Sequence, residues 1–249
     1  MLILLPPSEG KAAADSGPPL DLASLSFPEL TRTRTRVLEA LIRISGQRNA
    51  LRVLDVAPGL APQVERNTRL RESPAHPADR LYTGVLYEAL GLASLPPAAR
   101  ARADASVLIF SGLFGVLRPS DVVPAYRLSM GVDLPRSGAL AGIWRKVLGP
   151  VIETAAGDGP IIDCRSSTYA AAWKPPRSLA GRIVQVRVVQ EVDGKRSVVS
   201  HMAKKTRGEV ARALLLADRV ATVQDALETV RQSFEVEERQ GAFDVIVRG

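Results

Sequence analysis

The side chains of this sequence that could take part in binding or catalysis are concentrated in three polar segments. Each combines cations with hydroxyl or carboxylate groups, a pairing that can bind phosphate or carboxylate and move a proton. The residues are Ser8 and Lys11 in the first segment, Arg118, Asp121, Tyr126 and Arg127 in the second, and Lys204, Lys205 and Arg207 in the third. The first segment directly follows the apolar residues 2–5, which are typical of a buried strand.

The third segment, residues 200–208, places three cations where a helix is expected to begin. Free backbone N–H groups and the helix dipole at such a position attract anions, so acidic side chains are the usual residues there. Lys204, Lys205 and Arg207 depart from that preference. A local rule broken in this way indicates a function, and we expect these three residues to contact phosphate.

The second segment, residues 111–130, allows two interpretations. Arg118 and Arg127 could clamp an anion while Tyr126 or Asp121 transfers protons. Alternatively, either arginine forms a structural ion pair with Asp121 or Asp133, and Tyr126 belongs to the core. The sequence alone does not choose between them.

Arginines also crowd the region between residues 31 and 71. Apolar spacing predicts a helix over 27–44, on which Arg32 and Arg36 share a face and Arg34 does not. A short helix over 51–56, a tight turn at 57–61 and a helix over 62–71 follow. The simplest interpretation of these arginines is a solvated helix face.

Composition narrows the classes of function. Lysine and arginine total 33 against 26 acidic residues, which gives a net charge of +7 and favours a polyanionic partner. One cysteine and two histidines exclude an intrachain disulfide and offer no usual zinc-ligand spacing, so we expect no metal or cofactor. No apolar run approaches the ~18 residues of a membrane span. We expect a cytoplasmic monomer that does not enter a membrane.

The elements that must position the three segments alternate along the chain. Short buried strands are predicted at residues 2–5, 107–110 and 160–164, with a possible strand at 126–130 and an amphipathic helix at 140–155. A hairpin of 183–192 with 197–202 is predicted around Asp193-Gly194, and a second one joins 234–237 to 243–247. This interleaving predicts a mixed α/β fold in one compact domain, residues 1–249, with flanking helices.

Several of these residues resemble motifs of the YaaA family of peroxide-stress proteins. Residues 111–119, SGLFGVLRP, continue through Asp121, Pro124 and Tyr126-Arg127-Leu128 to Met130 and Gly131, and are similar to the family's SGLYGVLRPLD…PYRLEMG block. Residues 200–208 resemble its SFYAKKARG motif, and Tyr82-Thr83-Gly84 its YTG motif. At the N-terminus, residues 2–5 with the downstream Lys11 resemble the family's LILISPAK start, with Pro-Pro-Ser-Glu-Gly-Lys in place of SPAK.

The resemblance implies a cytoplasmic α/β protein with a basic cleft and a helix-hairpin-helix element that binds DNA and limits free-iron damage under peroxide stress. It implies phosphate contacts by Lys11, Arg118, Arg127, Lys204, Lys205 and Arg207. It also places the helix-hairpin-helix element at about residues 33–71, where its residues are Arg52, Pro58, Gly59, Leu60, Arg66 and Arg69.

Two functions therefore remain open. In the first, the protein binds duplex or distorted DNA through its phosphate backbone, without strong sequence specificity. In the second, it is an enzyme that acts on a phosphorylated or carboxylated small molecule, and Ser8, Asp121 and Tyr126 line a pocket built from the same segments. An enclosed pocket favours the enzyme, and an open groove favours DNA.

Overall fold

A mixed sheet with a parallel centre organises the structure. The computed structural model describes residues 1–192, 195–197 and 200–248. The strands of the main sheet are β1 (Leu2–Leu5), β3 (Val107–Ser111), β4 (Gly115–Leu117), β8 (Ile161–Asp163), β9 (Ile183–Val192), β10 (Lys195–Ser197), β11 (Glu235–Arg239) and β12 (Ala242–Arg248). Their order is β11-β12-β9-β8-β1-β3-β4, with β10 paired to β9.

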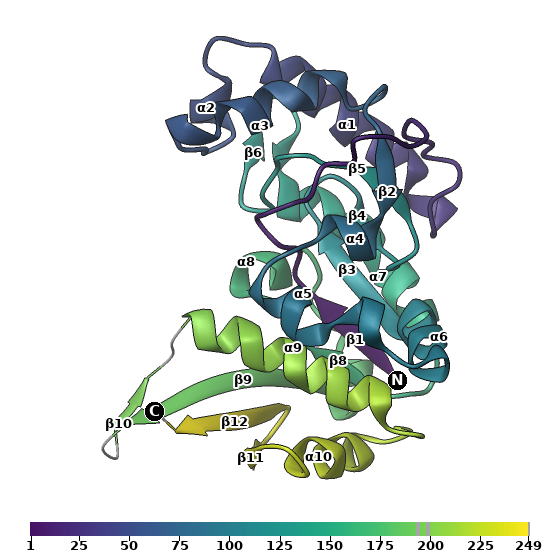
Figure 1. Cartoon of the computed structure of the whole chain (residues 1–249), viewed down its shortest axis with the longest axis vertical. Helices are drawn as coiled ribbons and strands as arrows, with labels where there is room; N and C mark the ends of the chain where they lie inside the picture. Colours follow the sequence, from purple (N-terminus) through teal and green to yellow (C-terminus); the bar gives the residue numbers. More distant parts are fainter. Residues whose placement is uncertain (193–194, 198–199, 249) are drawn as a thin grey trace.

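Strand direction divides this sheet into a centre and two edges. Strands β12, β9, β8, β1 and β3 are parallel to one another, whereas β11 and β4 pair in the antiparallel direction. Every residue of β1 and β3 is buried, as expected for apolar strands that are covered on both faces. The predicted single-domain α/β fold is confirmed (Figure 1).

Helices cover the sheet and build a separate cap at one end of the molecule. They are α1 (Thr31–Ser45), α2 (Ala50–Val53), α3 (Ala61–Arg66), α4 (Ala78–Leu81), α5 (Val85–Leu90), α6 (Pro97–Ser106), α7 (Leu140–Ala156), α8 (Ser167–Ala170), α9 (Ser200–Leu216) and α10 (Val223–Arg231). Short 3-10 helices span Pro28–Leu30, Pro58–Leu60, Asn67–Arg69, Leu92–Ser94 and Arg177–Arg182. Two small sheets pair β2 (Ala75–Pro77) with β5 (Val122–Pro124), and β6 (Asp133–Leu134) with β7 (Gly138–Ala139).

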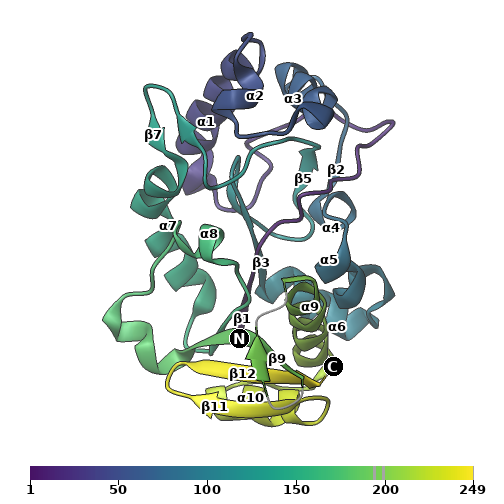
Figure 2. The same ribbon diagram turned by 90° about the vertical axis from the view of Figure 1, so that its left-hand side faces the viewer.

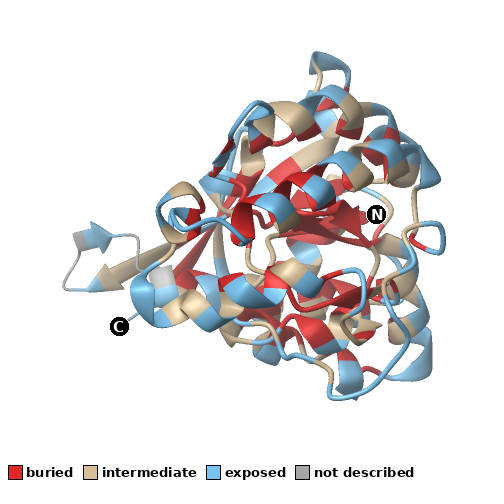
Figure 3. Ribbon diagram, turned by 90° about the horizontal axis from the view of Figure 1, so that it is seen from above, coloured by how far each residue is buried: buried red, intermediate tan, exposed pale blue. Residues whose placement is uncertain are grey.

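The cap and the C-terminal layer lie at opposite ends. Helices α1, α2 and α3 form one end of the molecule, and α10, β11 and β12 form the other (Figures 1 and 2). Between them the central strands are almost entirely buried, while the helices alternate buried and exposed residues along their length (Figure 3). This alternation is the amphipathic pattern that predicted the helices.

Helix α9 crosses α5 at a close contact that requires glycine. A Cβ atom placed on Gly208 would lie 2.2 Å from the carbonyl oxygen of Leu86 and 2.9 Å from the Cβ of Ala89. No side chain fits there without a shift of the backbone of α5. Gly208 therefore fixes how closely the cationic helix α9 approaches α5.

Two local predictions differ from the structure. The possible strand at 126–130 is irregular backbone, and the strand of this stretch lies earlier, at β5. Residues 200–202 were predicted in the hairpin, but they begin α9. The pairing of β9 with β10 confirms the hairpin itself, while its turn at Asp193-Gly194 lies outside the described residues. In the described part of the chain, no helix has both the length and the hydrophobicity needed to cross a bilayer.

Candidate functional site

The carboxyl ends of the parallel strands bring the first polar segment next to the start of the second. Leu5 at the end of β1 pairs with Ile109 of β3, two residues before Ser111. Beyond β1 the chain continues through Ser8 to Lys11, which forms a β-bridge with Tyr82. In open α/β sheets, this edge is where ligands bind. The observed edge therefore carries a candidate site centred on Lys11.

Lys11 lies among aromatic rings. Its Nζ donates a hydrogen bond of 2.9 Å to the carbonyl oxygen of Ser8. The same nitrogen is 4.6 Å from the ring centroid of Tyr126 and 5.7 Å from that of Tyr82. Ring faces attract an ammonium group, but they replace water poorly as a solvent for its charge.

Burial, rather than the neighbouring charges, shifts Lys11 toward its neutral form. Burial lowers the pKa of Lys11 to about 8; Glu9 opposes this shift and Arg127 adds to it. The carboxylate of Glu9 is paired with Arg127, at 3.0 Å between Oε2 and a terminal guanidinium nitrogen. Within the described ranges Lys11 has no ion-pair partner of its own. A partly neutral amine at neutral pH follows from this arrangement.

All four tyrosines of the chain gather at this edge. The rings of Tyr82 and Tyr87 stack with centroids 5.6 Å apart. The hydroxyl of Tyr87 donates to the carbonyl oxygen of Pro6, just after β1, at 2.7 Å. Tyr169 faces Tyr126 closely enough for the two to affect each other's ionisation. Burial raises the pKa of each tyrosine above its ordinary value, so all four hydroxyls stay protonated at neutral pH.

A chain of hydroxyl groups fixes the ring of Tyr126. Its oxygen lies 2.7 Å from Oγ of Ser111 and 2.8 Å from the hydroxyl oxygen of Tyr82. Oγ of Ser111 also accepts a 2.9 Å hydrogen bond from the backbone N–H of Phe114. Each buried hydroxyl therefore has a partner, and the ring that contacts Lys11 is held in one orientation.

Arg127 is positioned by a buried amide. Nδ2 of Asn67 donates to the carbonyl oxygen of Arg127 at 2.9 Å, and Oδ1 of Asn67 accepts from the N–H of Arg127 at 2.8 Å. The Arg127 side chain, 17% exposed, then extends to Glu9, which is 60% exposed. A cation held by its backbone and paired with an exposed, movable carboxylate can exchange that carboxylate for another anion.

Arg118 and Asp121 lie away from Lys11. Strand β4 runs antiparallel to β3, with Leu117 opposite Ile109, so Arg118 emerges at the opposite edge of the sheet. Its guanidinium group donates to the carbonyl oxygen of Ala105, which precedes β3. The structure therefore separates the two arginines of the second segment.

The Asp121 carboxylate holds a loop in place. Oδ1 accepts hydrogen bonds from the N–H and the hydroxyl of Ser26, at 2.8 and 2.9 Å, and Oδ2 accepts from the N–H of Arg118 at 2.8 Å. Asp121 is 6% exposed. Both oxygens are thus occupied, and the expected proton-transfer role would require breaking these bonds.

The three cations lie within α9, beyond its first turn, because the helix begins at Ser200 and not after them as predicted. Their surroundings differ. Lys204 and Lys205 are exposed, and Lys205 pairs with Glu209 one turn later at 3.4 Å. Arg207 is partly buried, where its Nε donates to the carbonyl oxygen of Val186 in β9 at 3.2 Å. The two lysines face solvent, whereas Arg207 ties α9 to the sheet.

A buried ion pair follows β8. Arg165 donates to both carboxylate oxygens of Asp163, at 2.8 and 2.6 Å, and its guanidinium carbon lies 4.5 Å from the ring centroid of Phe110. Cys164 lies between Asp163 and Arg165 in the sequence, and burial raises the pKa of its thiol to about 12. The thiol is therefore protonated and inert at neutral pH.

A second candidate site is the arginine-rich surface of the cap, residues 31–72. This segment holds nine arginines and four acidic residues, so it carries most of the net positive charge. Arg32 and Arg36 are exposed on one face of α1, as the spacing predicted, whereas Arg34, predicted to belong to the solvated set, is buried. Nε and one terminal nitrogen of Arg34 donate to the carbonyl oxygens of Phe114 and Val116. The eight exposed arginines are Arg32, Arg36, Arg43, Arg48, Arg52, Arg66, Arg69 and Arg71.

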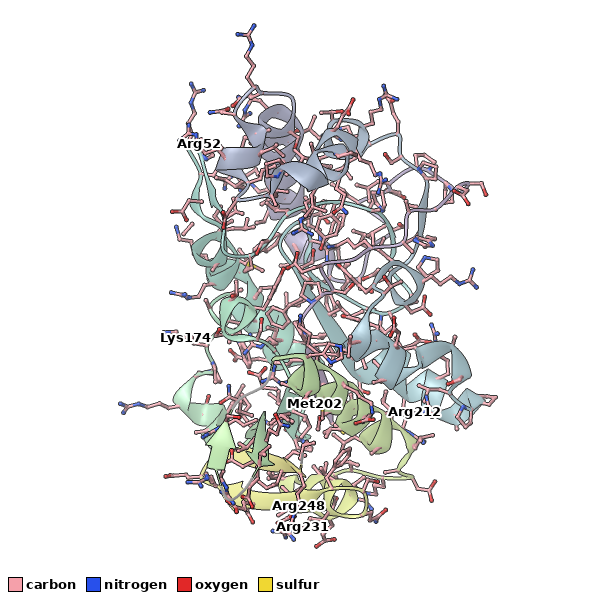
Figure 4. All side chains as sticks on the ribbon, turned by 60° about the vertical axis from the view of Figure 1, so that its left-hand side comes forward. Arg52, Lys174, Met202, Arg212, Arg231 and Arg248 are labelled. Atoms are coloured by element: carbon pink, nitrogen blue, oxygen red, sulfur yellow. The ribbon has the colours of Figure 1, made fainter. Side chains whose placement is uncertain are left out.

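The turn Pro58–Leu60, in which Pro58 and Gly59 are exposed, joins α2 to α3 within this surface. Arg52 extends into solvent at the cap, while Arg231 and Arg248 lie at the far end of the molecule (Figure 4). Among the residues of this surface, Arg71 pairs with Glu39 at 3.3 Å. Arg52, Arg66 and Arg69, all exposed, belong to the same surface.

Two surface hollows lie elsewhere on the molecule. One, of about 580 Å³, lies between α9 and α10 and includes Arg212 and Phe234. The other, of about 500 Å³, lies beside β11 and β12 and includes Arg239 and Phe243. Neither is lined by a predicted site residue. Over residues 1–192, 195–197 and 200–248, no three His, Cys, Asp or Glu side chains are grouped as metal ligands would be.

Sequence reasoning missed several residues at the Lys11 edge. Tyr82, Tyr87 and Tyr169 were not predicted as site residues, although Tyr82 belongs to the Tyr82-Thr83-Gly84 motif, which was a signal for that residue. Asn67 gave no signal, because nothing in its neighbourhood points to a partner 60 residues away.

Comparison with known proteins agrees with the motifs. A family model described as peroxide stress protein YaaA matches residues 1–240. A UPF0246 protein of Streptomyces coelicolor is 50% identical over 217 residues, covering 86% of this chain and 83% of the relative. A UPF0246 protein of Corynebacterium efficiens is 45% identical over 224 residues, which cover 89% of this chain and 88% of the relative. A UPF0246 protein of Corynebacterium glutamicum is 40% identical over 235 residues, which cover 94% of this chain and 92% of the relative. The chain belongs to the family of peroxide stress protein YaaA.

Proposed function

We propose that this protein binds the phosphate backbone of DNA in the cytoplasm during peroxide stress, through the arginine-rich surface of residues 31–72. The observation that supports this most directly is the eight exposed arginines on that surface, which has only four acidic residues. Such a density of cations attracts a polyanion from a distance and releases its counterions on contact. Contacts of this kind carry no sequence information.

The cap offers a defined way to approach a phosphate. We propose that the region 33–71 acts as a helix-hairpin-helix element, in which the turn at Pro58, Gly59 and Leu60 brings the backbone N–H of the exposed Gly59 to the DNA. Arg52, Arg66 and Arg69 flank this turn and contact neighbouring phosphates. Lys204 and Lys205 of α9 are a second, separate set of exposed cations.

Counterion release also suggests how binding limits iron damage. Divalent iron, like other cations, concentrates around DNA phosphates by Coulomb attraction. Arginines that neutralise those phosphates displace the cations from them. Bound protein then keeps iron, and the radicals that form where iron meets peroxide, away from the DNA.

Binding to labelled duplex, bubble and single-stranded DNA tests the proposal. The variant Arg52→Ala/Arg66→Ala/Arg69→Ala is compared with Lys204→Ala/Lys205→Ala at several salt concentrations. We expect the arginine variant to lose affinity on every duplex sequence to a similar degree. A larger loss of affinity in the lysine variant would indicate that DNA binds at α9. Equal affinity of the wild type and both variants would contradict the proposal.

A second function is favoured by a different observation, the placement of Lys11 among four tyrosines beside Arg127. We propose that this edge takes a phosphorylated or carboxylated small molecule. Non-specific backbone binding does not require a desolvated amine next to an oriented hydroxyl chain. Calorimetric titration with small phosphates and carboxylates tests this, with Arg127→Met expected to weaken binding and Arg118→Met, at the opposite edge, expected to leave it unchanged.

A further inference from the structure

We propose that Lys11 is an amine nucleophile that forms a Schiff base with an aldehyde or ketone carrying a phosphate or carboxylate group. The proposal rests on the second function above, an anionic small molecule at the Lys11 edge, and adds the reacting group. The amine touches one backbone oxygen and two aromatic rings. A buried lysine that serves structure alone normally has a carboxylate partner, and in the described part of the chain Lys11 has none.

The surroundings of Lys11 activate an amine chiefly by desolvation. Burial against the tyrosine rings removes water from the ammonium group and lowers its pKa, the guanidinium of Arg127 adds to this shift, and the carboxylate of Glu9 opposes it. The resulting pKa of about 8 makes the neutral, nucleophilic fraction at pH 7 on the order of 100-fold larger than for an ordinary lysine. Residue exposure is intermediate at Lys11, so part of the residue is in contact with solvent although its amine is desolvated.

Arg127 supplies the recognition of the anion. Asn67 fixes its backbone, while its guanidinium pairs with the exposed carboxylate of Glu9. An incoming phosphate or carboxylate would replace Glu9, which is free to turn into solvent. The anion and the carbonyl would then be held on one small molecule, between Arg127 and Lys11.

The covalent step balances without a further reactant. The neutral nitrogen of Lys11 attacks the carbonyl carbon, forming a C–N bond as the C=O π bond breaks. The carbinolamine then loses its oxygen as water, which carries away the two protons that were on the nitrogen. The product is an imine, protonated from solvent, and water reverses the reaction. Nothing is oxidised or reduced.

The required chemistry, an aldehyde near a phosphate, has two sources. One is a free sugar phosphate or a similar metabolite. The other is an abasic deoxyribose in damaged DNA, whose aldehyde form lies between two phosphates. The shared chemistry defines the proposal, and separate arms of the experiment distinguish the sources.

Trapping with borohydride tests the Schiff base directly. The full-length protein is incubated at pH 7 with pyridoxal 5′-phosphate or with pyridoxal, reduced with borohydride, and mapped by peptide mass spectrometry. The chain has six lysines, so every site can be quantified. We expect Lys11 to carry at least ten times more adduct than Lys146, an exposed lysine, and to lose most of it when the probe lacks phosphate.

Variants separate the amine from its anion site. Lys11→Arg and Lys11→Met should abolish the preferential adduct, whereas Lys146→Arg should leave it unchanged. Arg127→Met should reduce labelling by the phosphorylated probe toward the level seen with pyridoxal. The adducts of the wild-type protein are mapped without any substitution. This measurement therefore tests the proposal even if a Lys11 variant folds poorly. Adducts spread evenly over the lysines, or equal labelling with and without the phosphate, would overturn the proposal.

Further experiments identify the source of the aldehyde and distinguish failure of the Schiff base from failure of the anion site. A duplex with one abasic site and a free sugar phosphate, glyceraldehyde 3-phosphate, are each trapped in the same way, and the one that labels Lys11 at lower concentration is the source. Pyridoxine 5′-phosphate, an alcohol that cannot form an imine, tests anion binding alone. Binding of this alcohol without any aldehyde adduct at Lys11 refutes the Schiff base and retains the anion site. No binding of either compound refutes both.

Discussion

The side-chain amide of Asn67 holds Arg127 from both directions, donating to its carbonyl oxygen at 2.9 Å and accepting from its N–H at 2.8 Å. Asn67 is fully buried and follows α3 directly. The arginine-rich cap and the Lys11 edge are therefore connected through one residue. A movement of the helices that carry Arg66 and Arg69 would strain or break these two hydrogen bonds to the backbone of Arg127.

Replacing Asn67 with alanine should destabilise the protein by about 2–4 kcal/mol, because it leaves a buried N–H and a buried C=O without partners. Urea unfolding followed by circular dichroism measures the change. Asn49→Ala, at an exposed asparagine in the same cap, is the control, with an expected change within about 0.5 kcal/mol. Similar stability of the two variants would show that the amide does not hold Arg127.

Gly208→Ala should lower the free energy of unfolding by about 2 kcal/mol or more, because the new methyl group would overlap the backbone of α5. Gly142→Ala is the matched control in α7, where a Cβ meets nothing within 4 Å. There the substitution should stabilise the protein by up to about 1 kcal/mol, since alanine favours the helix. Thermal unfolding distinguishes the two signs, and destabilisation of both variants alike would argue against a close crossing.

Lys11→Met should change how stability depends on pH. Between pH 8 and about 10.4 the unfolded chain keeps the proton of Lys11 while the folded protein has lost it. Because the unfolded state then binds more protons, wild-type stability rises with pH through this window. Relative to Lys11→Met, the wild type should gain about 1 kcal/mol between pH 7 and 9 in urea unfolding. A constant difference between the two proteins would mean that Lys11 has an ordinary pKa.

The Asp163–Arg165 pair should show strong coupling. Asp163→Ala alone leaves the buried guanidinium of Arg165 without its carboxylate and should cost about 3–5 kcal/mol. The double variant Asp163→Ala/Arg165→Met removes both charges and should be destabilised by less than the sum of the single variants. Strict additivity in a double-mutant cycle would contradict a coupled pair.

The spacing of apolar residues predicted the strands that are buried along their whole length and the helices that are buried on one face. The apolar run Leu2–Leu5, the stripe that includes Trp144 in α7, and the shared face of Arg32 and Arg36 in α1 were recovered, because local spacing decides which face is covered. Residues 126–130 were misassigned because their backbone is bonded by a side chain of the 3-10 helix Asn67–Arg69, as where Asn67 bonds to Arg127, rather than by a partner strand.

The site was predictable only in part. Lys11 and Arg127 were expected to act together, and the structure brings them to one edge. Arg118 has the same side chain and lies in the same segment, but the antiparallel direction of β4 carries it to the other edge. Strand direction depends on pairing across the sheet, which local sequence does not encode. The tyrosine cluster depends on the same long-range pairing.

The salt dependence of DNA binding tests the central proposal most directly. The slope of log affinity against log salt is measured for the wild type, for Arg52→Ala/Arg66→Ala/Arg69→Ala, and for Arg177→Ala/Arg219→Ala/Arg231→Ala. All six arginines are exposed, so the two variants lose equal charge. If the cap contacts phosphates, the slope of Arg52→Ala/Arg66→Ala/Arg69→Ala is smaller in magnitude than that of the wild type by about 2–3. The slope of Arg177→Ala/Arg219→Ala/Arg231→Ala then equals the wild-type slope. Equal slopes in the two variants would mean that net charge alone, rather than the arginine-rich surface, holds the DNA.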